Sequence, residues 1–143
     1  MGLVLRDDPP RVIDMKGRVW GEPVEGLMLS IRELPRDNEH GVAGISVVMK
    51  NESPRAKTLR VRPLVFFYRI EGLDLAPYGR QFMSSQAGNE TAEVNLPAKG
   101  AIETDLPLGA IYNLRSAGTY TVRVSCGLPG GELLRSNDLA IRV

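Results

Sequence analysis

The sequence predicts an all-β protein, a sandwich or barrel of about seven to eight short antiparallel strands. Apolar and polar residues alternate with a period of two in several segments, which is typical of strands that bury one face. Turn-forming Gly, Pro, Asn and Asp residues separate these segments, and no segment has the apolar spacing of an amphipathic helix. Short alternating strands between turns favour two packed sheets or one closed sheet.

The composition is typical of one globular domain without a strong overall charge. The chain has 143 residues, 43% of them hydrophobic and 24% charged, enough to bury a core without disulfides or metal ions. Lys and Arg number 18 against 17 Asp and Glu, so the net charge is +1. A nearly neutral chain has no general attraction for nucleic acid or an anionic membrane. We therefore expect no nucleic-acid partner.

No stretch of the chain has the length of a membrane span. Crossing a bilayer takes about 20 consecutive apolar residues, and no apolar run approaches that length. The first residues, MGLVLRDDPPR, contain too short an apolar run for the core of a signal peptide. The compartment stays open, and we favour an extracytoplasmic location with any signal peptide already missing from this sequence.

We expect a lead-in segment at 1–25 that packs on a single β-sandwich at 26–143. The lead-in mixes charges, Pro9 and Pro10 with isolated apolar residues, as a partly ordered segment does. Its tryptophan, Trp20, stands among turn-forming residues, and we expect it to cover one end of the sandwich.

Period-two alternation marks the strands in order. The middle run KTLRVRPLVFFYRIEG is the longest, and Pro63 interrupts it because proline cannot donate to a strand ladder. The part from Leu64 to Ile70 either continues the third strand or turns a corner into a new one. The longest polar loop follows at 76–91, and GLPGGE forms the last turn. The expected strands are 27–32, 45–50, 59–62 with or without 64–70, 92–96, 101–106, 120–126 and 138–143.

The segment LRSAGTY followed by TVRV resembles the turn into the penultimate strand of immunoglobulin-like sandwiches, where a tyrosine corner locks the sheets. LLRSNDLAIRV and VNLPAKGAIETDL also resemble strands of bacterial immunoglobulin-like modules, so the resemblance covers 26–143. It implies that the Tyr120 hydroxyl bonds to the backbone between Leu114 and Gly118, with Gly118 permitting the tight turn. The fold is then an immunoglobulin-like antiparallel β-sandwich without a disulfide, because Val122 stands where that family has its second cysteine. This pattern is similar to fibronectin-like bacterial modules.

A second likeness concerns the order of a strand, the LPAKG turn, a strand and the GTY strand. This order resembles bacterial proteinase-inhibitor domains built on a similar sandwich. The resemblance implies an alternative function, a proteinase inhibitor that presents a loop such as 76–91 to a protease cleft.

The sequence does not predict an enzyme, a cofactor or a metal site. Its single histidine, His40, and its single cysteine, Cys126, stand far apart in the chain, and no nucleophile-elbow pattern occurs. Zinc sites need more Cys and His residues than the chain has. Glu103 and Asp105 alternate on one strand face, and no Asp/Asn-rich loop surrounds them to hold calcium. We interpret that face as solvated.

Cys126 is interpreted as core packing. It shares a strand face with Tyr120 and Val122, and a lone cysteine often behaves as a small hydrophobic residue. The alternative is a free reactive thiol, because one cysteine cannot form an internal disulfide.

Two Asn-x-Ser/Thr triplets, at Asn51 and Asn89, match the acceptor pattern for N-glycosylation. They matter only in a eukaryotic secretory context, and such triplets arise often by chance.

One predicted partner-binding surface is a basic sheet face. In the immunoglobulin-like order the third, penultimate and last strands share a sheet, which would place four arginines on its outer face. Their guanidinium groups would repel one another unless acidic neighbours or a partner intervened, and arginine is suited to carboxylates. The alternative is a solvated face. The four arginines are Arg60, Arg62, Arg123 and Arg142.

A second predicted surface is the 76–91 loop, where Tyr78, Arg80 and Phe82 stand among small polar residues. Aromatic residues and arginine are common contact groups at interfaces. Alternatively, Tyr78 and Phe82 pin the loop to the core. We expect a non-catalytic protein-interaction or accessory module that binds a protein partner through a sheet face, an edge strand or this loop. The strand edges could also pair with a second copy of the chain.

Overall fold

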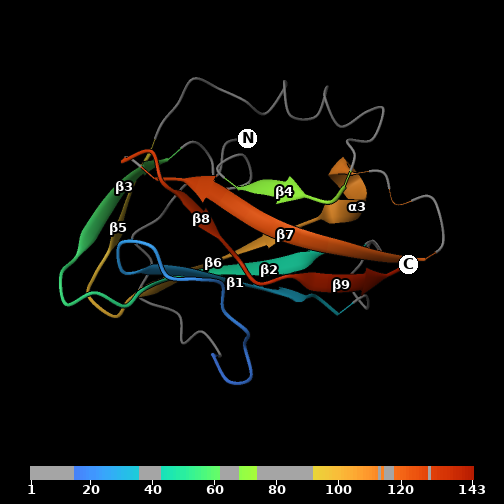
Figure 1. The fold of residues 1–143 in the computed structure, drawn as a ribbon, viewed down its shortest axis with the longest axis horizontal. Coiled ribbons are helices and arrows are strands. Elements are labelled where there is room, and N and C mark those ends of the chain that lie inside the picture. Colours follow the sequence, from blue (N-terminus) through green and yellow to red (C-terminus); the bar gives the residue numbers. More distant parts are fainter. Residues whose placement is uncertain are drawn as a thin grey trace.

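The chain forms three antiparallel sheets with almost no helix (Figure 1), in a computed structural model that describes residues 15–35, 43–61, 68–73, 92–112, 114, 118–128 and 130–143. The all-β prediction is confirmed. The single helical element, α3, is one turn at Leu108–Ile111 within those residues. The first sheet has the order β1-β2-β6, formed by Leu27–Glu33, Ile45–Asn51 and Ala101–Leu106.

The second sheet has β7 at its centre, and the third is a two-stranded ribbon. Strand β7, Thr119–Gly127, pairs with β4 on one side and with β8 and β9 on the other. The ribbon pairs β3 with β5 at one end of the molecule (Figure 1). The bounds are Arg69–Glu71 for β4, Leu133–Arg135 for β8, Leu139–Arg142 for β9, Lys57–Val61 for β3 and Ala92–Leu96 for β5.

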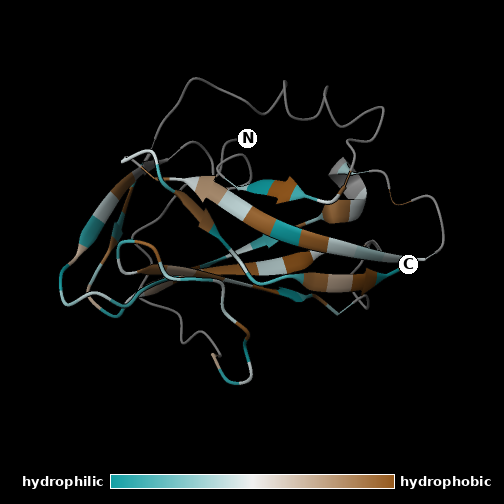
Figure 2. Ribbon diagram, viewed as in Figure 1, coloured by the Kyte–Doolittle hydropathy of each residue, from teal (hydrophilic) through white to brown (hydrophobic). Residues whose placement is uncertain are grey.

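All three sheets contribute to one apolar core. Alternate residues of β1 point inward, so Leu27, Leu29 and Ile31 are at most 2% exposed. Figure 2 shows the same alternation of apolar and polar residues along β7. The ribbon adds apolar side chains from both of its strands. The period-two pattern therefore predicted the buried face correctly along β1 and β7.

Two parts of the sequence form more strands than expected. The 57–71 run turns a corner, because β3 pairs with β5 whereas β4 pairs with β7. Pro63 lies outside the described residues. The end of the chain also forms two strands, β8 and β9, which pair with different parts of β7. The described residues thus contain nine strands, against the seven or eight predicted.

The described part of the lead-in segment, residues 15–25, lies along the outer edge of β1. The Gly21 amide donates to the Leu29 carbonyl at 2.9 Å, and Val24 exchanges two backbone hydrogen bonds with Leu27. The Ser30 hydroxyl donates to the carbonyl of Val19 at 2.7 Å. A side chain at Gly21 would collide with the carbonyl oxygen of Arg135, only 2.0 Å from the position of a Cβ atom, so glycine is required there. These contacts leave no room for another strand along this part of β1.

The lead-in is also fixed across the outer face of β2. The side chain of Arg18 is fully buried, and its Nη2 donates to the Ser46 hydroxyl at 2.8 Å and to Glu103 at 3.3 Å. The Ser46 hydroxyl donates to the same carboxylate at 2.9 Å. Both faces of β2 are therefore buried, although only one of them faces the core.

Three consecutive residues between β8 and β9 form side-chain hydrogen bonds to β7 and β1 in place of backbone pairing between strands. The Ser136 hydroxyl accepts from the Val124 amide at 2.9 Å. The Asn137 side chain accepts from the Ile31 amide at 2.9 Å and donates to the Ile31 carbonyl at 3.2 Å. Asp138 accepts from Nε of Arg123 at 2.7 Å. Asn137 therefore links the second sheet to the edge of β1.

Replacing Asn137 with alanine should destabilise the fold by about 2–3 kcal/mol, because it leaves the buried amide and carbonyl of Ile31 without partners. Urea unfolding measures this change. Asn95→Ala is the matched control, since Asn95 is exposed on β5 and its loss should cost little. Equal stability of the two variants would contradict the bridging role of Asn137.

Candidate functional site

The predicted basic face is not assembled as expected. Arg60 lies on β3 opposite Glu93, in the ribbon, whereas Arg123 and Arg142 belong to β7 and β9. The expectation that the third strand shares a sheet with the last two is therefore wrong, because β3 pairs with β5 rather than with β7. Arg62 lies outside the described residues.

Arg123 is neutralised within its own sheet. Its guanidinium donates to Asp138, and it stands opposite Glu71 in the β4–β7 register. The hydrogen bond from Arg123 holds the pKa of Asp138 below its ordinary value and raises the pKa of Arg123. Arg142 is paired in register with Thr119, about 13 Å along β7 from Arg123. These two arginines therefore do not form a joint docking site.

The residues predicted to be structural have definite places. Gly118 has a φ of +147°, and its amide and carbonyl both bond to Val143, at 3.1 and 2.8 Å. Tyr120 is half-buried against the core and pairs in register with Ile141. Trp20 is half-buried beside the middle of β1. Residues 115–117 are not described, so the tyrosine corner stays a prediction.

The second predicted surface cannot be placed. The 76–91 loop, with Tyr78, Arg80 and Phe82, lies outside the described residues, and so does His40.

Cys126 is part of the core, as predicted. Its side chain is 2% exposed on the inner face of β7. Burial raises the pKa of the thiol from 9.0 to about 12. Burial also raises the pKa of the neighbouring Tyr68. A thiol that keeps its proton in this way is a poor nucleophile.

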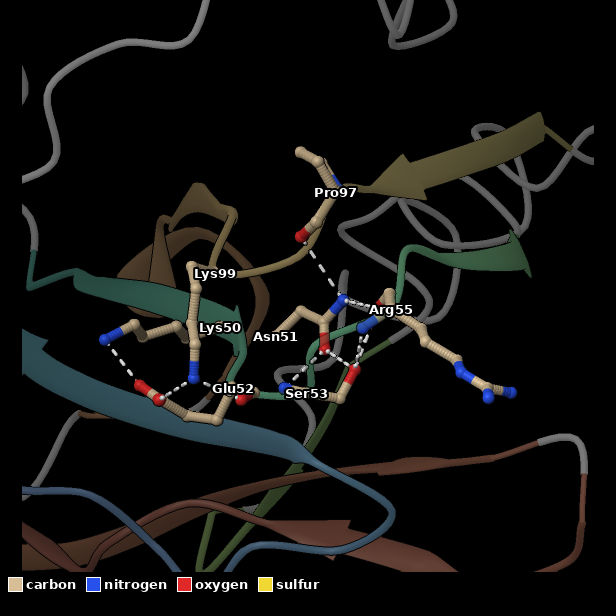
Figure 3. Close-up of polar contacts among 7 residues, drawn as sticks. All are labelled: Lys50, Asn51, Glu52, Ser53, Arg55, Pro97 and Lys99. Atoms are coloured by element: carbon tan, nitrogen blue, oxygen red, sulfur yellow. Dashed lines mark hydrogen bonds and ion pairs between the residues drawn. The ribbon is translucent and has the colours of Figure 1, made fainter.

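Asn51 is a buried anchor between two turns (Figure 3). Its Nδ2 donates to three carbonyl oxygens, those of Arg55, Leu96 and Pro97, at 2.8 to 3.2 Å. Its Oδ1 accepts from the amide and the hydroxyl of Ser53, at 3.0 and 2.7 Å. One side chain thus joins the loop before β3 to the turn after β5.

The environment of Asn51 rules out the glycosylation reading of its triplet in this fold. A glycan is attached at Nδ2, and this nitrogen is fully buried and bonded to backbone carbonyls. The sequence pattern suggested an acceptor, whereas the structure gives this asparagine a turn-fixing role. Asn89 lies outside the described residues.

Next to Asn51, two lysines share one carboxylate. The Nζ atoms of Lys50 and Lys99 both lie within ion-pair distance of Glu52 (Figure 3). The hydrogen bond from Lys50 lowers the pKa of Glu52 the most, and Lys99 adds to this effect.

A groove of about 300 Å³ opens beside β3, between this strand and the turn after β7. Its apolar lining comes from Leu27, Leu59 and Leu128, each at most 6% exposed. Lys57 and Thr58 lie on the β3 side, and the opposite side is formed by Glu25 and Gly130. The groove could not be predicted from the sequence, because it is created by the separation of β3 from β7.

A second depression, of about 290 Å³, lies between β4 and β7. Arg123, Asp138 and Glu71 line it together with Gly72, Thr121 and Val122. Two of its charged residues, Arg123 and Asp138, form the ion pair already described, and the third, Glu71, stands opposite Arg123 in the strand register.

Two further classes of site have no counterpart in the described ranges. These ranges contain no group of three or more His, Cys, Asp or Glu side chains placed to hold a metal ion. They also contain no helix that is both long and apolar enough to cross a membrane.

Comparison of the chain with protein-family models, with curated proteins and with solved structures gives no match. Function must therefore be inferred from the geometry of the chain itself.

Replacing Asn51 with alanine should lower the free energy of unfolding by about 3 kcal/mol, because three carbonyls and the Ser53 amide lose a buried partner. Urea unfolding measures the loss. Ser53→Ala, which removes only a hydroxyl at the edge of the same network, should cost much less. Similar losses in the two variants would show that Asn51 is not the anchor.

Cys126 should resist thiol reagents in the folded protein. At about pH 8 a disulfide reagent should label it only at the rate of unfolding, and fully in urea. Because the pKa of the thiol is raised in the folded state, stability should fall as the pH rises from about 9 towards 12. Labelling of the native protein as fast as a short cysteine peptide would contradict the buried thiol.

Proposed function

We propose that the protein is a non-catalytic protein-interaction module on an immunoglobulin-like β-sandwich, and that it binds an extended partner segment at the edge of β3. The strand orders β1-β2-β6 and β4-β7-β8 support the immunoglobulin-like form, because that fold also packs two antiparallel sheets built from strands distant in the sequence. The burial of Cys126 supports a role without nucleophilic catalysis.

The proposal is supported by the difference between strand edges that are covered and the edge of β3. The edge of β1 is occupied by Val24, Gly21 and the Asn137 side chain. At β4, the backbone of Ile70 donates a hydrogen bond to the Tyr112 hydroxyl. This bond counteracts the increase in the pKa of Tyr112 that burial causes. Side chains or the lead-in therefore cover both of these edges, as native proteins commonly do to avoid unwanted pairing.

Strand β3 differs from β1 and β4 in this respect. Within the described residues, the backbone of Lys57, Thr58 and Leu59 bonds only to β5. In an antiparallel pair, part of the backbone N–H and C=O groups of each strand face away from its neighbour. Within the described part of the structure those of β3 have no bond to another segment, and the addition of a strand at such an edge is a recurring mode of peptide recognition.

The groove supplies the second part of the site. A strand added along β3 places every second side chain on the same side. The apolar lining of Leu27, Leu59 and Leu128 accepts a hydrophobic side chain of the partner. Backbone pairing provides affinity in this mode of binding, and the pocket provides specificity.

The inhibitor function remains the alternative proposal. It depends on the 76–91 loop, which lies outside the described residues, so no contact within those residues favours it.

Filling the groove should abolish binding. Gly130 accepts a larger residue, because a Cβ there would meet only the Glu25 carboxylate, at 3.5 Å. Peptides selected from a random displayed library against the wild type should bind Gly130→Phe at least about tenfold more weakly, measured by fluorescence anisotropy. Photo-crosslinks from the bound peptide should fall on β3.

The matched control is Gly127→Phe, at a position where a Cβ meets nothing within 4 Å and which does not line the groove. This variant should bind the selected peptides like the wild type. Peptides that bind all three proteins equally would overturn the proposed site. A dimer that forms in the wild type and is lost in Gly130→Phe would identify a second copy of this chain as the occupant of the edge.

A further inference from the structure

We infer that the extended partner segment is acidic, with carboxylates that meet a basic corner at the start of β3. This inference rests on the proposed function, because it concerns what binds at the same edge. The basic corner is defined as residues 50–57 together with 97–99. Its charged residues are the cations Lys50, Arg55, Lys57 and Lys99 and the single carboxylate Glu52.

The ion pairs of the described residues do not balance the positive charge of the basic corner. The whole protein has a net charge of only +1, so four cations against one carboxylate is a local excess. Lys50 and Lys99 both use Glu52 as their counter-ion. Neither Arg55 nor Lys57 forms an ion pair within the part of the chain that the structure describes.

The position of the unbalanced cations is fixed relative to β3. The Arg55 carbonyl accepts hydrogen bonds from Asn51 and from the Ser53 hydroxyl, both at 2.8 Å, which holds the backbone just before the strand. Figure 3 shows the Arg55 side chain directed away from the Asn51 anchor and from Glu52. Lys57 is the first residue of β3 and lines the groove itself.

The groove also determines the order of apolar and acidic side chains in the partner segment. The side of the groove opposite Lys57 carries Glu25, so positive charge lies on the β3 side only. A partner strand along β3 directs alternate side chains to the two faces of the pairing. An apolar residue would enter the leucine-lined floor beside Leu59, and an acidic residue two positions along on the same face would approach Lys57 and, beyond it, Arg55.

Carboxylates fit these cations chemically. Arginine binds a carboxylate through two parallel hydrogen bonds, and lysine acts as a compact point charge. Exposed ion pairs contribute little energy individually, so they add specificity and faster association to the backbone pairing rather than most of the affinity. Binding of the acidic partner should consequently weaken with salt, since screening is effective for exposed charges.

Two displayed peptide libraries test the inference on the full chain. Both place random apolar and charged residues in turn at every second position, on one strand face, and the charged residues are Asp or Glu in the first library and Lys or Arg in the second. Binders should come from the acidic library. Their affinity should fall about tenfold in the Arg55→Glu, Lys57→Glu double variant, because attraction becomes repulsion at two positions. It should also fall when salt rises from about 50 mM to about 500 mM.

Arg32→Glu is the matched charge-reversal control. Arg32 is exposed on β1, five residues or about 16 Å from Leu27 at the groove, which is beyond the screening length of about 8 Å at physiological salt. This variant should bind the acidic peptides like the wild type. Equal weakening in Arg32→Glu and in the double variant would overturn recognition at the basic corner.

The remaining outcomes separate the inference from the function it rests on. If both libraries yield binders of equal affinity and Gly130→Phe abolishes all of them, the edge binds peptides but the acidic preference is wrong. If neither library yields a binder that Gly130→Phe weakens, the proposed function fails together with the inference. If a single-stranded oligonucleotide displaces the acidic peptides at equal charge concentration, the corner recognises polyanions in general, which also overturns an acidic protein partner.

Discussion

The two hydrogen bonds between the Asn137 side chain and the backbone of Ile31 are the contact on which the arrangement of the sheets depends. Strand β1 lies at the edge of its sheet, yet its side chains reach deep into the core, so its outward backbone groups must be satisfied by protein. An asparagine amide presents one donor and one acceptor side by side, as a neighbouring strand would. Asn137 thereby joins the second sheet to β1, and its neighbours Ser136 and Asp138 fix the same turn against β7.

The same device recurs elsewhere, with side chains taking the place of absent strands. Asn51 bonds to three carbonyls of two turns, and the Tyr112 hydroxyl bonds to the backbone of β4. Each such bond closes an edge or a turn without requiring another strand, at the expense of burying a polar group that must stay fully bonded. The edge of β3 is informative against this background, because within the described residues the edges of β1 and β4 carry such bonds, whereas the edge of β3 carries none and lies beside a groove.

Alternation in the sequence predicted the individual strands well and their partners poorly. The expected strands at 92–96 and 101–106 coincide with β5 and β6, because burial of one face imposes the period that the sequence displays. The pairing of β3 with β5 could not be read in this way, since alternation is local whereas strand partners are set by contacts across the whole fold. The structural roles of polar residues in turns were equally hard to predict from the sequence. Asn51 matched a glycosylation pattern, and nothing near it in the sequence indicated burial.

The contrast between Arg123 and Arg55 explains why the candidate site lies at a corner rather than on a sheet face. Arg123 lies within β7 and Arg55 lies just before β3, and the sequence alone favoured Arg123 as a contact residue. The turn after β8 brings Asp138 to Arg123, so its charge is satisfied within the protein and a partner would have to displace that bond. The Asn51 anchor instead holds Arg55 where Glu52 is already occupied by two lysines. A partner's carboxylate therefore gains a new interaction at Arg55, whereas at Arg123 it would only replace one, and this difference directs an acidic segment to the edge of β3.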